Sequence, residues 1–280
     1  MKTVTSRDGT QIGYTQVGNG PALILVQGAL GTAHNYRDLA EALSSDFTVY
    51  TPDRRGRGMS PKPFTPDHQI QYDVEDIEAL STHAGAMYLF GLSSGAVIAL
   101  KSCLRIGMIR KAVIYEPPFY FEQGIDRERV DRFQREVRGE CWLEAMTTAG
   151  EIVKLAPFPV RHLPRPVRER LTAGIMLKLG GGGGYARLEE LLPSMRYDFQ
   201  VVGEMNQQIQ MFKALNKEVL LLGGTRSPRY LKLALSELET TLPNASRRTF
   251  PGLDHSGPWN ADRGGAPWIV AEAIRSFLKT

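Results

Sequence analysis

The chain has 280 residues, of which 42% are hydrophobic and 23% charged, and its formal net charge is +4. This length and composition predict one large globular domain, with room for an inserted subdomain, and argue against a disordered chain. The basic residues are spread along the chain, which argues against the charged stripe of a nucleic-acid-binding protein.

The first residues include no apolar run of signal-peptide length, and no later stretch approaches the roughly 20 apolar residues of a membrane span. Cys103 and Cys141 form no CxxC pair, so we expect reduced thiols and no zinc or redox site. We therefore expect a cytoplasmic protein whose partner is a small-molecule substrate, not a membrane or a nucleic acid. The sequence leaves a homodimer open.

Short strand and helix patterns alternate through the first part of the chain. Asp8-Gly9 is a hairpin turn signal between residues 2–6 and 11–16, which predicts an antiparallel pair of strands. The run ALILV at 22–26 is apolar without alternation, which is typical of a strand buried on both faces. Further strands are expected at 47–51, 87–90 and 111–115, and helices near 39–43, 70–80 and 97–104.

This alternation stops after residue 118. Helical patterns continue to about residue 215, broken by prolines and by five consecutive glycines at 180–184. Such a run cannot lie inside a helix, so it predicts a loop or joint. We interpret residues 119–215 as a helical cap inserted into a core that comprises residues 1–118 and 216–280.

Strand patterns return at 219–222 and 247–250, and residues 268–278 form an amphipathic helical pattern. The whole order predicts an α/β fold, a mostly parallel sheet with helices on both faces. Ligands of such sheets bind at the carboxyl ends of the strands. The polar residues just past predicted strands are Gln27, Asp53, Ser93, Glu116, Ser227 and His255.

Ser93 is the centre of the run Gly91-Leu92-Ser93-Ser94-Gly95. A serine on a tight turn between a strand and a helix exposes its hydroxyl above the sheet, and the flanking glycines let the backbones approach. Backbone N–H groups at the start of the helix then point toward a developing oxyanion. A strand is predicted before this run and a helix after it, so we predict that Ser93 is a nucleophile.

The sequence resembles α/β-hydrolase-fold enzymes with a helical cap, of the esterase, lactonase and perhydrolase type. The resemblance rests on VQGALG (26–31), PDRRGRGMS (52–60), GLSSGA (91–96), YEPPF (115–119), LLGGTRSP (221–228) and PGLDHSGP (251–258), which occur in the family's order. It implies an eight-stranded sheet, serine chemistry, and neither a cofactor nor a metal.

A serine hydroxyl needs a neighbouring base. His255 fits this role because it follows the last predicted strand, in a loop flanked by glycines and C-terminal to the serine. His68 and His83 are expected to have surface roles. The loop Asp53–Gly58 resembles a structural loop of the family, and we expect ion pairs there and not a phosphate site.

The acid of the triad departs from the family pattern. Family members usually carry an aspartate where this chain has Ser227, and serine cannot supply the negative charge that stabilises an imidazolium. Some members take the acid from the end of the strand before the cap, which here is Glu116. The alternatives are a structural ion pair between Glu116 and Arg226, and an acid from the cap, Asp198.

By the resemblance, the oxyanion donors are the backbone N–H groups of Ala29 and Ser94. Gln27 stands where the family often has a histidine. Several further side chains near strand ends and the cap are candidates for an apolar substrate pocket. They are Leu30, His34, Tyr36, Phe119, Trp142, Tyr197 and Trp259.

The leading hypothesis is a serine hydrolase that cleaves a carboxylic ester, lactone or thioester of a mainly apolar small molecule through an acyl-enzyme. A perhydrolase, an acyltransferase or a C–C bond hydrolase would use the same residues. A non-hydrolytic cyclase, isomerase or ligand receptor is the alternative from another class, because a fold does not fix a function.

Overall fold

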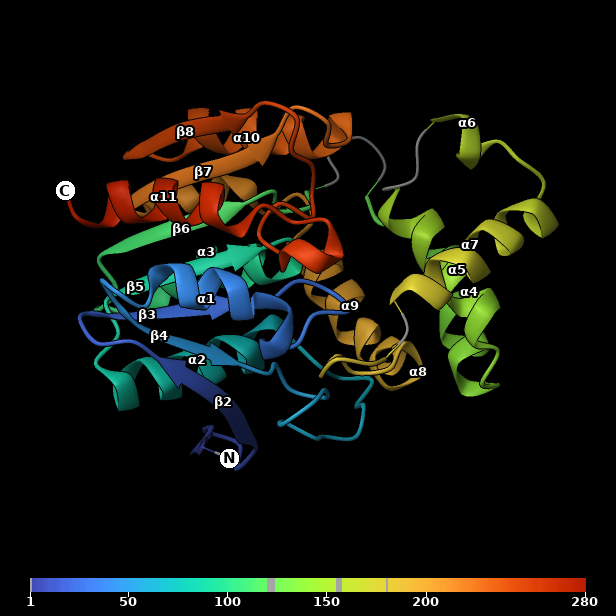
Figure 1. The fold of residues 1–280 in the computed structure, drawn as a ribbon, viewed down its shortest axis with the longest axis horizontal. Coiled ribbons are helices and arrows are strands. Elements are labelled where there is room, and N and C mark those ends of the chain that lie inside the picture. The colour runs from blue at the N-terminus through green and yellow to red at the C-terminus, as the bar shows by residue number, and fades with distance from the viewer. Residues whose placement is uncertain (1, 120–123, 155–157, 180) are drawn as a thin grey trace.

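The computed structural model describes residues 2–119, 124–154, 158–179 and 181–280. Its centre is an eight-stranded sheet in the order β1-β2-β4-β3-β5-β6-β7-β8 (Figure 1). The strands are β1 (Lys2–Thr5), β2 (Gln11–Val17), β3 (Ala22–Val26), β4 (Thr48–Pro52), β5 (Tyr88–Leu92), β6 (Lys111–Tyr115), β7 (Glu218–Gly224) and β8 (Ala245–Phe250). Both pairings of β2 are antiparallel and the others are parallel, which confirms the predicted mostly parallel sheet.

Local sequence explains the first strands. Gly9 takes φ 84° in the turn between β1 and β2, a conformation that favours glycine, and Thr10 N–H donates to Asp8 Oδ1 at 3.0 Å. β3 is buried along its whole length, as its unbroken apolar run predicts.

Helices cover both faces of the sheet. They are α1 (Arg37–Leu43), α2 (Ile70–Ala84), α3 (Ser94–Arg105), α10 (Arg229–Thr241) and α11 (Pro267–Leu278). Alternate side chains of β3 enter two separate apolar layers, Ile24 with α2, α3 and α10, and Leu25 with α1 and α11. The sheet is therefore the middle layer of three.

The segment between β6 and β7 is helical. It comprises α4 (Arg127–Arg138), α5 (Trp142–Val153), α6 (Phe158–Arg161), α7 (Arg165–Leu179), α8 (Leu188–Leu191) and α9 (Met195–Met205), with the 3-10 helices η2 (Leu192–Ser194) and η3 (Ile209–Ala214). Two further 3-10 helices are η1 (Ala33–Tyr36) and η4 (Ala261–Arg263). Figure 1 shows α4 to α7 beyond the carboxyl ends of the parallel strands. Gly181–Gly184 lie in the loop before α8, as predicted, and residue 180 lies outside the described residues.

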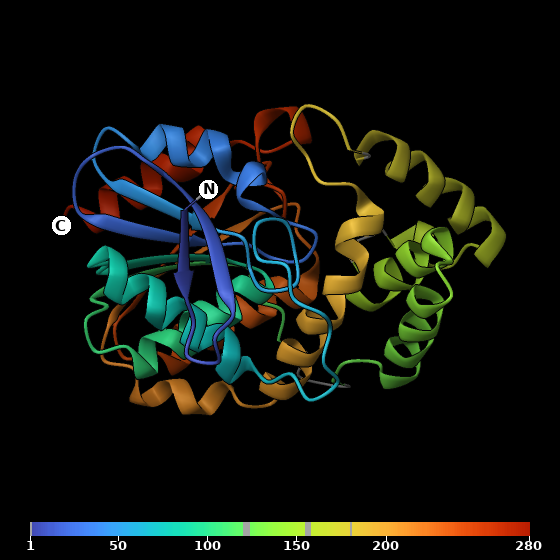
Figure 2. The same ribbon diagram turned by 90° about the horizontal axis from the view of Figure 1, so that it is seen from below.

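Helix α9 belongs to two apolar layers at once. Met195 and Phe199 pack with Phe133 in a cluster formed by α4, α5 and η2. Val201 and Met205, further along α9, are part of the large cluster on the sheet. Figure 2 shows the same helix between the core and the outer helices. α9 thus docks directly on the core while it also packs against the outer helices.

Candidate active site

Ser93 occupies the turn between β5, which ends at Leu92, and α3, which begins at Ser94. Its backbone has φ 56° and ψ −127°, a strained conformation for a residue with a side chain. Its N–H donates to Tyr115 O at 3.0 Å and so ties the turn to β6. A strand enters this turn and a helix leaves it, which is the context that the motif predicts.

Two glycines allow the loop after β3 to approach this turn. A Cβ at Gly95 would lie 2.4 Å from Gln27 O, and a Cβ at Gly28 would lie 2.8 Å from Ser93 Cβ. Both distances are shorter than van der Waals contact, and the first is to a backbone atom that cannot rotate away. The close approach of the two loops therefore depends on glycine at both positions.

Glu116 follows β6, is fully buried and takes φ 45°. Its Oε2 lies 2.7 Å from His255 Nδ1, and its Oε1 accepts the Gly224 N–H at 2.7 Å. Both oxygens of the carboxylate are therefore held. A carboxylate at Nδ1 selects the imidazole form that carries its proton there, which leaves Nε2 free to accept one.

Tyr115 anchors the loop that carries His255. Its hydroxyl donates to Asp254 O at 2.8 Å, and burial, together with nearby Glu116 and Asp254, raises its pKa far above the ordinary value. A Cβ at Gly257 would lie 2.4 Å from this hydroxyl, so the loop can close over it only with glycine there.

Among the described residues, no hydrogen bond joins Ser93 to His255, and such contacts are often long until a substrate binds.

The two predicted oxyanion donors lie in segments that meet at the tight turn of Ser93 between β5 and α3, which is called the elbow below. Ser94 is the first residue of α3, where a backbone N–H has no partner within the helix. Ala29 lies in the loop after β3, and the next residue, Leu30, takes φ 56°. Within the described part of the chain, no backbone hydrogen bond outside helices and strands uses either N–H.

A family model for the alpha/beta hydrolase family matches residues 23–266, from β3 to the loop before α11. The chain belongs to the alpha/beta hydrolase family. Over 265 residues it is 25% identical to 2-(acetamidomethylene)succinate hydrolase of Mesorhizobium japonicum, covering 93% of this chain and 89% of that protein. It is 32% identical over 140 residues to the uncharacterized hydrolase YraK of Bacillus subtilis, covering 46% of this chain and half of that relative's length.

The solved structures agree with this assignment to the alpha/beta hydrolases. An alpha/beta hydrolase from Sphaerobacter thermophilus superposes with a TM-score of 0.78 at 27% identity, covering 97% of this chain and 99% of that one. The likeness includes the inserted helical segment as well as the sheet, because nearly all of both chains is matched. Together the comparisons support a hydrolase.

In the described part of this alpha/beta hydrolase, the other residues considered for the position or the pairing of the acid form no hydrogen bond or ion pair with His255 or Glu116. Ser227 is buried, and among the described residues its hydroxyl has no hydrogen-bond partner. Arg226 is exposed and forms no ion pair with Glu116. Asp198 binds Arg54, Arg57 and Ser94 and does not bind His255.

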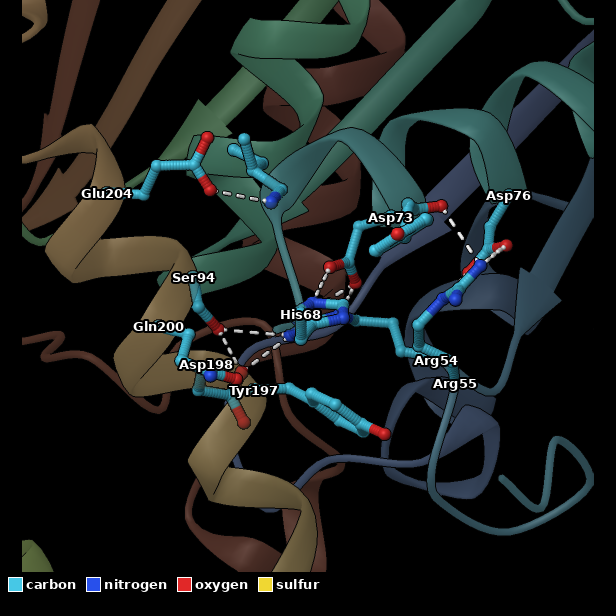
Figure 3. Close-up of polar contacts among 12 residues, drawn as sticks. Arg54, Arg55, His68, Asp73, Asp76, Ser94, Tyr197, Asp198, Gln200 and Glu204 are labelled. Carbon is cyan, nitrogen blue, oxygen red and sulfur yellow. Dashed lines mark hydrogen bonds and ion pairs between the residues drawn. The ribbon is translucent and has the colours of Figure 1, made fainter. Parts of the chain in front are cut away.

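The loop after β4 forms the ion pairs that were predicted for it, and Figure 3 shows those of Arg54 and Arg55 with carboxylates of α2 and α9. Arg55 pairs with Asp76 of α2, and Arg54 pairs with Asp73 and Asp198.

The prediction that His68 lies at the surface is wrong. Its ring is buried, and its Nε2 lies 2.7 Å from Asp73 Oδ2. Burial would raise the pKa of the Asp73 carboxyl, but Arg54, His68 and Arg55 together hold that pKa well below its ordinary value. The partners of these arginines on α2 and α9 were missed because no local pattern marks them.

The predicted pocket residues lie in three environments. Leu30 and Trp259 line a small pocket of about 20 Å³ together with Tyr185, and the His34 ring lies perpendicular to the Tyr185 ring at a centroid distance of 4.5 Å. Trp142 is half-buried and packs on the α4–α5 cluster, as Leu30 also does. The other three are at most 2% exposed and packed inside the protein: Tyr36, Phe119 and Tyr197.

Two further kinds of feature are absent from the described residues. No group of three or more His, Cys, Asp or Glu side chains there is placed to hold a metal ion. None of the helices formed by those residues has the length and apolar character needed to cross a membrane.

Proposed function

We propose that this alpha/beta hydrolase is a serine hydrolase that cleaves a carboxylic ester, lactone or thioester of a mainly apolar small molecule. Ser93 is the nucleophile, His255 the general base and Glu116 the acid that orients the histidine. The observation that carries the proposal is the 2.7 Å contact between Glu116 and His255 Nδ1, made at the strand end next to the elbow. It supplies the carboxylate that the chain lacks at Ser227.

The proposed reaction begins when His255 Nε2 takes the proton of Ser93 Oγ as that oxygen attacks the carbonyl carbon. The carbonyl π electrons move onto oxygen, and the N–H groups of Ala29 and Ser94 stabilise the resulting oxyanion. The oxyanion then collapses, the leaving alcohol or thiol receives the proton from His255, and an acyl-enzyme remains. Water, deprotonated by His255, attacks the acyl carbon, and collapse of this second oxyanion breaks the bond to Ser93 Oγ, which takes the proton back from His255 as the carboxylic acid leaves.

The substrate preference follows from the surfaces near the oxyanion loop. Ala29 and Leu30 pack against the same apolar cluster as Trp142 and Met146 of α5, and Leu30 also lines a small pocket with Trp259. These side chains favour an apolar acyl or alcohol group.

Covalent labelling tests the nucleophile without knowledge of the natural substrate. A fluorophosphonate probe should label the wild-type protein, and tandem mass spectrometry should place the adduct on Ser93 and not on Ser94. Ser93→Ala keeps Ser94 and is the matched control, which should take no label. A wild-type protein that takes no label would contradict the proposal and favour a binding protein or a non-hydrolytic enzyme.

Turnover of a substrate panel then defines the reaction. The panel contains aryl esters of increasing acyl length, lactones, thioesters and an enamide of a dicarboxylic acid, the bond type named for the Mesorhizobium relative. We expect turnover of esters or lactones with apolar acyl groups, abolished in Ser93→Ala. Adding hydrogen peroxide as a competing acceptor distinguishes hydrolysis from perhydrolysis.

A further inference from the structure

Asp198 is a buried carboxylate that the proposed reaction does not use. It lies on α9, is 2% exposed, and is bound by three side chains of the core. Its Oδ1 accepts from Ser94 Oγ and from Arg54, both at 2.6 Å, and its Oδ2 accepts from Arg57 at 2.8 Å (Figure 3 shows the first two partners). Both carboxylate oxygens are therefore occupied.

The partners of Asp198 reach both segments of the proposed oxyanion hole. Ser94 itself supplies one of the two N–H donors in the proposed mechanism. On the other side, Arg57 donates to Gly28 O at 2.9 Å and to Gly31 O at 3.2 Å, the carbonyls that bracket Ala29 and Leu30. Arg54 donates to Gln27 O at 3.3 Å. One carboxylate thus lies at the junction of the two segments.

We propose that Asp198 is a positioning residue of the oxyanion hole, which fixes the loop after β3 through Arg54 and Arg57 and the start of α3 through Ser94. The inference rests on the proposed function, since it assigns a role to groups that hold the donors of that reaction. Asp198 does not touch the reacting atoms and acts only through these three side chains.

Asp198 belongs to a network of buried ion pairs. Two guanidinium groups, Arg54 and Arg57, face two carboxylates, Asp73 and Asp198. Burial opposes the ionised form of Asp198, but Arg57, Arg54 and the Ser94 hydroxyl together hold its pKa below the ordinary value. Removing the Asp198 charge would leave a buried excess of positive charge beside the oxyanion loop, and the two arginines would have to move.

Helix α9 is itself held rigidly against the core, so Asp198 is a fixed reference for the loop. Along one face of α9, Tyr197 donates to Pro63 O at 2.8 Å and Gln200 donates to Pro66 O at 2.6 Å. One turn further, Glu204 accepts the N–H of Ile70 at 2.8 Å, at the start of α2. These contacts make the cap helix part of the scaffold of the site.

The test measures fluorophosphonate labelling of the full-length protein at 25 °C, resolved into the reaction rate (kinact) and the binding constant (KI). Asp198→Asn keeps the size of the side chain and removes its charge. We expect kinact to fall about 10- to 100-fold, while KI changes less than threefold. This fall in kinact is somewhat smaller than the fall expected when one oxyanion donor is removed outright. Ser94→Ala keeps the backbone N–H and removes one contact of Asp198, and we expect a fall of about 3- to 10-fold.

Asp76→Asn is the matched control. Asp76 is likewise buried in an ion pair with an arginine of the same loop, Arg55, but contacts no part of the oxyanion segments. This variant should lower Tm and leave kinact within twofold of the wild type. Asp198→Asn with a lowered Tm but wild-type kinact would overturn the inference and leave the proposed function intact.

Ser94→Ala keeps the inference falsifiable if Asp198→Asn does not fold. Wild-type kinact in Ser94→Ala would then count against a positioning role. A wild-type protein without label would contradict the proposed function, and the inference would fall with it.

Discussion

The carboxylate of Glu116 lies 2.7 Å from His255 Nδ1, although 139 residues separate the two in the chain. Its second oxygen accepts the N–H of Gly224, so the sheet itself fixes the direction in which the carboxylate points. Because the carboxylate cannot rotate without losing that bond, the imidazole that it binds is held in one orientation. This pairing explains how a chain with Ser227 after β7 can still provide a charged partner for its histidine.

Glu116→Gln should lower kcat by about two to four orders of magnitude with the fold intact. The amide keeps the shape but loses the charge that stabilises an imidazolium. Hydrolysis of an aryl ester that the wild type accepts is the measurement, with circular dichroism as a check of folding. Asp254→Asn, which removes the acid adjacent to His255 in sequence, should keep kcat within about fivefold. Near-normal turnover in Glu116→Gln would assign the role to another carboxylate.

Two helical glycines should respond in opposite ways to alanine. A Cβ at Gly95 would lie 2.4 Å from Gln27 O, so Gly95→Ala must push the loop after β3 away, at a cost of about 1–3 kcal/mol and with loss of activity. Gly150, in α5, has no atom within 4 Å of that position, so Gly150→Ala should stabilise the protein by about 0.5–1 kcal/mol. Urea unfolding measures the change in stability of each variant, and ester hydrolysis measures the change in activity. Equal effects of the two substitutions would contradict the inference that Gly95 allows the close approach of the loop after β3.

The strands and turns that depend only on neighbouring residues in the sequence could be predicted. The unbroken run 22–26 is a strand buried on both faces because its side chains are apolar in both directions. The strand, glycine, serine and helix around Ser93 follow one another directly, so the turn could be predicted without a tertiary contact. Glu116 and His255 were both expected at the carboxyl edge of the sheet, because parallel strands end at the same edge, whereas their pairing was implied by the family resemblance.

The partners in the buried ion pairs could not be predicted. Asp198 was considered as an acid for His255, but it lies 141 and 144 residues from the arginines that bind it. His68 was expected at the surface because it lies in a proline-bearing loop, whereas its ring is buried against the tilted ring of Tyr197 of α9, at a centroid distance of 4.2 Å. Asp198 and Tyr197 both lie on α9, and the sequence carries no periodic signal for where that helix docks.

Tyr185 fastens the segment after the glycine run to the core. Its hydroxyl donates to Asp262 at 2.5 Å and accepts from Asn260 at 2.8 Å, and Arg263 lies over its ring. Tyr185→Phe removes both hydrogen bonds and should cost about 1 kcal/mol or less, because the site is partly exposed.

Amide hydrogen exchange measures this effect locally. Residues 181–188 should exchange faster in Tyr185→Phe, while the strands of the sheet keep the wild-type rate. Tyr88→Phe is the control, since among the described residues no hydrogen bond of the Tyr88 hydroxyl is present. Unchanged exchange in residues 181–188 would mean that ring packing alone holds the segment.

The stability of the protein should depend on pH through Asp198. Burial would raise its pKa, but Arg57, Arg54 and Ser94 lower it below the ordinary value of about 4 that an unfolded chain would show. Folding therefore favours the ionised form, so this stabilisation is fully present above about pH 4 and is lost as the pH falls further.

Asp198→Asn cannot titrate and lacks this contribution at every pH. At neutral pH the wild type should be more stable than this variant by about 3–5 kcal/mol, the cost of breaking a buried ion pair. The difference should stay constant from pH 7 to about 5 and shrink below about pH 4, as urea unfolding at each pH would show. Asp131→Asn, at an exposed position, should stay within about 0.5 kcal/mol of the wild type throughout. A difference that persists undiminished at pH 3 would mean that Asp198 contributes by shape and not by charge.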